Sequence, residues 1–338
     1  METSKIIRNA LKIAFPLVLG GLILWWMYRD FDWQGLWAAL EGGMDWTWMW
    51  LSMPFGVLAQ MLRALRWRQS LEPLGERPRL SSCMHAVFLS YASSLVVPRV
   101  GEVLRCGVLK RYDGTAFTKA LGTVVTERMV DSLVMLLLSA LTVLMQVKVF
   151  AVFFRETGVS FGTLAGRFSA AGYWVTAACL LVLLAFLWFM ARRLEWFSHT
   201  RGLLRNVADG ILSLRGIRHM PLYVAYSLGI WVAYFLHFYL TFYSFSYTSG
   251  LGVMSALIAF VVGSFAVLVP TPNGAGPWHF AVKTVLVLYG VGEPDGVMFV
   301  LIVHTLQTLL IILLGLYAAV ALAFTRRKSP PEVRLGAA

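Results

Sequence analysis

Residues 89–105 read LSYASSLVVPRVGEVLR, an apolar run that is interrupted at Pro98 and Gly101. Proline removes a backbone donor and stops an incoming helix, while glycine permits a tight turn. The stretch therefore predicts two half-helices joined by a turn, inside an apolar region that covers 80–109. A second apolar region, 251–289, is broken in the same way, because its residues 261–276 read VVGSFAVLVPTPNGAG.

The two broken regions resemble each other in composition and order. Each has a helix rich in small residues, then Val-Pro, then a turn containing glycine, then a second helix. The charge pattern places their openings on opposite sides of a membrane, so we expect re-entrant hairpins in an inverted repeat whose tips meet near the bilayer midplane. Chance similarity between apolar stretches remains the alternative.

The composition around these regions is that of a helical membrane protein. The 338 residues are 59% hydrophobic and 14% charged, whereas soluble domains average about 25% charged residues. A helix needs roughly 20 apolar residues to cross the hydrocarbon layer. We therefore expect an all-α polytopic fold with the two hairpins and about six full spans, near 11–28, 46–62, 120–147, 172–190, 221–245 and 296–324.

The distribution of basic residues predicts the orientation. Most of the 29 Lys and Arg fall on one side if both termini are cytoplasmic, as the positive-inside rule requires. This arrangement places Arg63 and Arg66 in a polar cytoplasmic segment, 63–79. Residues 195–218 alternate basic with aliphatic side chains and predict an amphipathic interfacial helix, with a plain basic loop as the alternative.

The domain organisation follows from the same pattern. We expect one transmembrane domain, 1–325, and a disordered cytoplasmic tail, 326–338, which is basic and rich in proline. In a membrane protein the net charge of +12 reflects these cytoplasmic residues and gives no reason to expect nucleic acid as a partner.

Charged residues stand inside or beside the apolar runs, where each costs about 2.5–3.5 kcal/mol on insertion scales. They must pair, reach water or hold a charged ligand. Glu127 and Asp131 share a face of one helix because they are four residues apart. The set predicts either an ion-pair staple or a site for an anionic headgroup, and both roles are compatible: Arg99, Glu102, Arg105, Glu127, Arg128 and Asp131.

The second tip offers a different kind of anion site. Backbone N–H groups at the start of its second half-helix are expected to cradle a phosphate, with Asn273, Gly274 and Gly276 at the turn. His279 lies one turn further on and is either part of this site or a satisfied polar side chain. His237, His304 and Gln307 are expected to form interhelical hydrogen bonds.

Motifs of other chemistries are missing from the sequence. The three cysteines lack metal-ligand spacing, and there is no HExxH, Walker or Gly-x-Ser-x-Gly motif. We therefore expect no metal, no cofactor and no nucleophilic catalysis, and the protein is not expected to be an enzyme.

Three stretches together resemble the membrane region of lysylphosphatidylglycerol synthases: Pro98–Arg105, Glu127–Asp131 and Pro272–Gly276. That region also occurs alone, in flippase-like bacterial and archaeal membrane proteins, and the resemblance covers roughly 5–325. It implies a lipid-translocating domain of two inverted halves in a bacterial or archaeal cytoplasmic membrane. The soluble domain with which the synthases transfer an amino acid from tRNA has no counterpart here, so that activity is not implied. Asn273 replaces the first glycine of the family's Gly-Gly pair, and His279 stands near its acidic position.

The resulting expectation is a transporter that moves a lipid with an anionic phosphate headgroup between leaflets. Arg99 and Arg105 would contact the phosphate, with the carboxylates positioning the arginines and Gly274 and Gly276 allowing close backbone approach. The alternatives are an accessory protein or membrane enzyme acting on a polyprenyl-phosphate lipid, with Glu102 or His279 as base, and a channel for small ions. Whether the chain forms a homo-oligomer or acts with a partner enzyme stays open.

Overall fold

The computed structural model describes residues 33–97, 100–145, 216–269 and 271–326, together with Trp25 and Arg29. In this part of the chain every regular element is a helix, apart from one isolated bridge between Met44 and Phe245. The all-α expectation is confirmed for these residues. The short elements are α2 (Trp33–Ala38), η1 (Ala39–Gly43), η2 (Glu72–Leu74), η4 (Leu240–Ser244) and α12 (Ser246–Ser249).

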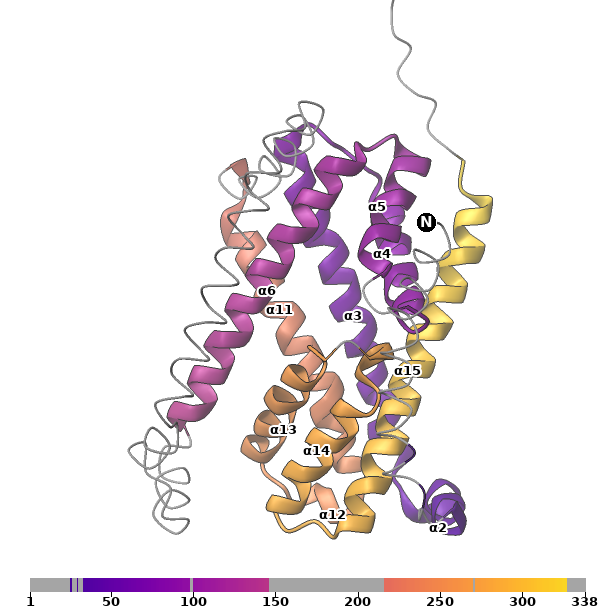
Figure 1. Ribbon diagram of the computed structural model, residues 1–338, viewed down its shortest axis with the longest axis vertical. Coiled ribbons are helices and arrows are strands. Elements are labelled where there is room, and N and C mark those ends of the chain that lie inside the picture. The colour runs from indigo at the N-terminus through magenta and orange to yellow at the C-terminus, as the bar shows by residue number, and fades with distance from the viewer. Residues whose placement is uncertain are drawn as a thin grey trace, which may run out of the picture.

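Helix α3 (Trp46–Leu71) packs along α11 (Met220–Tyr239) through the middle of the molecule (Figure 1). It begins at Asp45, whose Oδ1 accepts a hydrogen bond of 2.8 Å from the N–H of Thr47. The sequence predicted a span that ends at 62 and a cytoplasmic segment from 63. The helix continues beyond that point to Leu71, and it buries two of the arginines assigned to the polar segment.

Helices α4 (Leu80–Ser94) and α5 (Val100–Asp113) form the first hairpin. Their close approach depends on Gly101, since a Cβ there would lie only 2.0 Å from the carbonyl oxygen of Ser90. The turn at this point confirms the interruption that the sequence predicts within 80–109.

The base of the first hairpin is held by Arg79. Its Nε lies 2.7 Å from Oδ1 of Asp113, and its Nη2 donates to the carbonyl oxygens of Tyr112 at 2.9 Å and Arg326 at 3.0 Å. This base clamp joins the start of α4, the end of α5 and the chain just beyond the last helix.

The second hairpin consists of α13 (Val253–Ala266), the short η5 (Pro272–Gly274) and α14 (Pro277–Leu288). Its turn requires positive φ angles at three residues: Asn273 (51°), Gly274 (72°) and Gly276 (89°). Asparagine and glycine are the residues that tolerate this region. Figure 1 shows the two hairpins rising from opposite ends of the molecule, with their tips facing each other near its middle.

The remaining long helices are α6 (Phe117–Met145) and α15 (Glu293–Phe324). Two described stretches are long and apolar enough to cross a bilayer, Met220–Ser244 and Glu293–Phe324, and these match the predicted spans at 221–245 and 296–324.

Several other predictions fall outside the described residues. They are the spans at 11–28 (apart from Trp25) and 172–190, the interfacial helix up to residue 215, and the tail from 327. The total of about six spans therefore stays a prediction.

Each hairpin packs into its own apolar core. One core gathers Phe242 and Phe299, whose rings lie 5.2 Å apart, together with Leu286 of the second hairpin. The other gathers Trp67 of α3 and Leu109 of the first hairpin.

Candidate functional site

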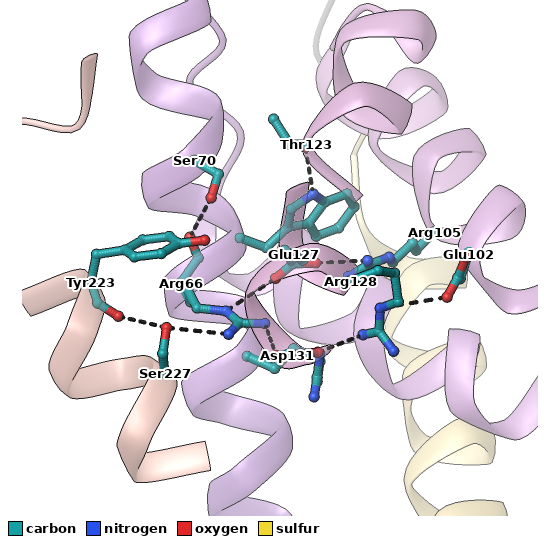
Figure 2. Close-up of polar contacts among 12 residues, drawn as sticks. Arg66, Ser70, Glu102, Arg105, Thr123, Glu127, Arg128, Asp131, Tyr223 and Ser227 are labelled. Carbon is teal, nitrogen blue, oxygen red and sulfur yellow. Dashed lines mark hydrogen bonds and ion pairs between the residues drawn. The ribbon is translucent and has the colours of Figure 1, made fainter. Parts of the chain in front are cut away.

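An ion pair network connects α3, α5 and α6 in the interior (Figure 2). Arg63 and Arg66 share a face of α3 because they are three residues apart. The carboxylate of Asp131 on α6 receives both, with 2.6 Å from Oδ2 to Nη1 of Arg63 and 2.7 Å from Oδ1 to Nη2 of Arg66. Arg66 also donates to Oγ of Ser227 on α11 at 3.2 Å.

Glu127 lies one helical turn before Asp131 and is fully buried. Its Oε2 lies 2.7 Å from Nη2 of Arg105 on α5, and its Oε1 lies 3.5 Å from Nε of Arg66. The guanidinium of Arg105 also stacks over the ring of Trp67, 4.5 Å from the ring centroid. The pairing that the sequence predicted between α5 and α6 is therefore present.

Arg128 forms the outer part of the network. Its Nη2 lies 3.2 Å from Oδ2 of Asp131, and its Nε lies 3.6 Å from Oε1 of Glu102. The side chains of Arg128 and Glu102 are 44% and 36% exposed, in contrast to the buried pairs behind them.

The described members of the network carry one positive charge in excess, because four arginines face three carboxylates: Arg63, Arg66, Arg105 and Arg128 against Glu102, Glu127 and Asp131. Arginine stays protonated in proteins. Removing one partner from a buried ion pair typically costs about 3–5 kcal/mol, so the inner pairs tie the three helices together. The excess charge suits an anion.

A cavity of about 470 Å³ lies between the two hairpin tips. Its wall includes three of the arginines, Arg63, Arg105 and Arg128, and the carboxylate of Glu102. This volume is typical of a site for a small molecule or headgroup. The other polar groups of the wall are Ser90, Tyr91, Ser94, Ser132, Thr271 and Asn273.

Thr271 is the clearest sign that the wall accommodates a polar ligand. It is buried and lines the cavity, and its Oγ1 has no hydrogen-bond partner among the described residues. A buried hydroxyl without a partner is costly, so a ligand that hydrogen-bonds to it would gain stability.

The tip of the second hairpin is held by a closed circuit of hydrogen bonds. Asn273 donates from Nδ2 to Oγ1 of Thr308 at 2.8 Å, and the Thr308 hydroxyl lies 3.4 Å from Nδ1 of His304. His304 closes the circuit by donating from Nε2 to the carbonyl oxygen of Asn273 at 3.1 Å. The circuit fixes the amide of Asn273 at the cavity wall.

Three backbone N–H groups in the turn before α14 donate to acceptors within the tip itself. The N–H groups of Gly274 and Ala275 donate to the carbonyl oxygens of Thr271 and Pro272, and the N–H of Gly276 donates to Nδ1 of His279 at 3.3 Å. These three donors already have acceptors, so a phosphate cradle at this tip stays a prediction for the N–H groups at the start of α14.

The predicted residues thus separate into groups. Glu102, Arg105, Arg128, Asn273 and Gly274 line the cavity, and Glu127 and Asp131 hold the arginines from behind. Gly276 and His279 are not part of the wall; the ring of His279 packs against that of His304 at 4.3 Å. Arg99 lies outside the described residues.

Two interhelical contacts expected from the sequence are also present. His237 lies with Nδ1 2.8 Å from the carbonyl oxygen of Ser52, and Gln307 donates to the carbonyl oxygen of His237 at 3.2 Å.

Arg63 and Arg66 are the site residues that sequence reasoning missed. They were assigned to a cytoplasmic segment because basic residues are usually found there. A signal was nevertheless present: they are three apart and interspersed with Leu62, Ala64 and Trp67, which continue the apolar pattern of α3.

Comparison with known families adds a finding that is independent of this geometry. Residues 13–315 match the family model described as the lysylphosphatidylglycerol synthase transmembrane region. No curated protein matches the chain significantly.

Proposed function

The chain belongs to the family of the lysylphosphatidylglycerol synthase transmembrane region, and from this premise we propose that it moves a lipid with an anionic phosphate headgroup between the leaflets of a membrane. Membership of the family makes it a membrane protein with a lipid-related role. We further propose that it moves this lipid, that the headgroup is anionic and that the protein is not an enzyme.

The observation that carries the proposal is the cavity between the opposed hairpin tips, whose wall includes Arg63, Arg105 and Arg128. Guanidinium groups bind phosphate through charge-assisted, often bidentate, hydrogen bonds. Without such a cavity the charged headgroup would have to enter the hydrocarbon layer, which is unfavourable in free energy, whereas the lipid tails already lie there. A cationic cavity at mid-depth lowers this barrier while the tails remain in the bilayer.

The membrane arrangement follows from the same hairpins. We place them as re-entrant elements of an inverted repeat, with both termini in the cytoplasm, so that each tip reaches the midplane from its own side. Small relative movements of the two tips would then open the cavity to one leaflet or the other.

A different class of function is supported by one feature. Glu102 is a half-exposed carboxylate at the cavity wall, where it could serve as a base for a reaction on a polyprenyl-phosphate lipid. His279, the other candidate base, is not part of the wall. Product formation by the purified protein, without lipid movement, would favour this alternative.

The proposal is tested by lipid movement in reconstituted vesicles. Fluorescent phosphatidylglycerol is followed by its accessibility to an impermeant quencher, with wild type, Arg128→Gln and Arg68→Gln compared. Arg68 is a matched control because its side chain is 41% exposed, is paired with Glu72 at 3.9 Å and does not line the cavity.

We expect Arg128→Gln to slow movement about tenfold or more, through loss of a charge-assisted contact, and Arg68→Gln to leave it unchanged. Equal rates of movement in wild type and Arg128→Gln would contradict the proposal.

A further inference from the structure

The three carboxylates of the network are not equivalent. Glu127 and Asp131 are buried, lie behind the cavity wall and each come within 2.7 Å of an arginine. Glu102 lines the cavity, its side chain is 36% exposed, and its contact with Arg128 is longer, at 3.6 Å. A longer and more hydrated ion pair is weaker, so Glu102 is the carboxylate that another anion displaces most easily from its arginine.

Arg128 would keep its orientation if Glu102 were displaced. Its Nη2 is held at 3.2 Å by Asp131, three residues away on the same helix, whereas its Nε faces Glu102 on α5. If Glu102 turned away, Asp131 would still orient the guanidinium toward the cavity. An incoming phosphate oxygen could then take the place of the carboxylate oxygen, because both are anionic acceptors.

We infer that the carboxylate of Glu102 lies where an oxygen of the headgroup phosphate would bind Arg128. Through this position Glu102 selects lipids whose headgroup is a phosphodiester over lipids that end in a phosphomonoester. A displaced Glu102 stays anchored to α5 at the cavity wall and repels further negative charge. A phosphodiester brings one negative charge, whereas a phosphomonoester carries about −1.5 to −2 at neutral pH. This inference rests on the proposed function and names its substrate class.

The selection acts on the headgroup and leaves the tail undetermined. Diacylglycerol lipids and polyprenyl lipids can both carry a phosphodiester, for example phosphatidylglycerol and a polyprenyl phosphosugar. The corresponding phosphomonoesters are phosphatidic acid and polyprenyl phosphate. These four lipids form the arms of the experiment.

The test compares movement of the four lipids in reconstituted vesicles by wild type, Glu102→Gln and Glu72→Gln. Glu72 is the matched control, since its side chain is 47% exposed, is paired with Arg68 and does not line the cavity. Wild type should move phosphodiesters faster than phosphomonoesters, whichever tail is accepted. Glu102→Gln removes the charge with little change of shape and should lower that ratio about tenfold. Glu72→Gln should leave the ratio unchanged.

A second measurement needs no substitution. Lowering the pH from about 7.5 to about 5.5 protonates a phosphomonoester, whose second pKa is about 6, and should narrow the preference in wild type by speeding the movement of the phosphomonoesters alone.

The outcomes separate this inference from the proposed function. An unchanged ratio in a folded, active Glu102→Gln protein, or faster movement of phosphomonoesters by wild type, would overturn the role of Glu102 and leave lipid movement standing. A failure of wild type to move any of the four lipids would instead overturn the proposed function.

Discussion

Arg63 on α3 and Asp131 on α6 are 68 residues apart in the sequence, yet their Nη1 and Oδ2 atoms lie 2.6 Å apart. The same carboxylate also holds Arg66 and Arg128. One carboxylate therefore positions three arginines, two of which line the cavity. Asp131 therefore contributes both to the stability of the network and to the arrangement of the arginines that we propose to bind the headgroup.

Replacing Asp131 by Asn should destabilise the protein severely. The variant leaves Arg63 and Arg66 buried without their principal counter-charge, and the loss of one partner in a buried ion pair costs about 3–5 kcal/mol. Thermal unfolding of the purified protein in detergent measures the effect.

The control for this substitution is Asp295→Asn, at the exposed start of α15. Its expected cost is below about 1 kcal/mol. Similar unfolding temperatures for Asp131→Asn and wild type would show that the network does not join the helices.

Gly101→Ala and Gly107→Ala should have opposite effects, although both lie in α5. A Cβ at Gly101 would approach the carbonyl oxygen of Ser90 to 2.0 Å, whereas nothing lies within 4 Å of one at Gly107. Overpacking costs about 1–3 kcal/mol, while alanine in an open helical position gains up to about 1 kcal/mol over glycine. Unfolding temperatures of the two variants give the comparison, and equal shifts would mean that the hairpin does not close at Gly101.

Thr308→Val should loosen the tip of the second hairpin. The substitution removes the acceptor of Asn273 Nδ2 and leaves that amide short of a partner, at a cost of about 1–3 kcal/mol. Thr284→Val is the control, because the hydroxyl of Thr284 is exposed and, among the described residues, donates to the carbonyl oxygen of Phe280 in its own helix.

Two measurements report on the tip. We expect Thr308→Val to lower the unfolding temperature and to raise the lipid concentration needed for half-maximal movement. Thr284→Val should change neither, and a Thr308→Val protein indistinguishable from it would show that the circuit does not fix Asn273.

The hairpins were predictable from sequence because their causes are local. Proline and glycine act on the backbone near their own positions, so the interruption between Ser94 and Val100 and the turn at Gly274 and Gly276 could be located from the chain alone. The shared face of Glu127 and Asp131 was likewise fixed by their spacing.

The inner half of the network could not be predicted because its cause is tertiary. In the sequence Arg63 and Arg66 resemble loop residues. Their burial is explained only when the carboxylates of α6, which compensate the desolvation of the two guanidinium groups, are placed against them. The orientation of the second tip is a similar case. The N–H of Gly276 donates to His279 in the first turn of α14, and α14 is positioned by contacts with both α13 and α15 that the sequence does not reveal.

The base clamp at Arg79 has a mechanical consequence. Arg79 connects the base of the first hairpin to the chain beyond α15 through hydrogen bonds. The close approach at Gly101 holds α4 and α5 against each other. Nearer the tip, α4 again lies against α15, where a Cβ at Gly315 would come within 2.2 Å of Cβ of Ala92. Displacement of the C-terminal end of α15 would therefore move the first hairpin as one body and carry Glu102 and Arg105 with it.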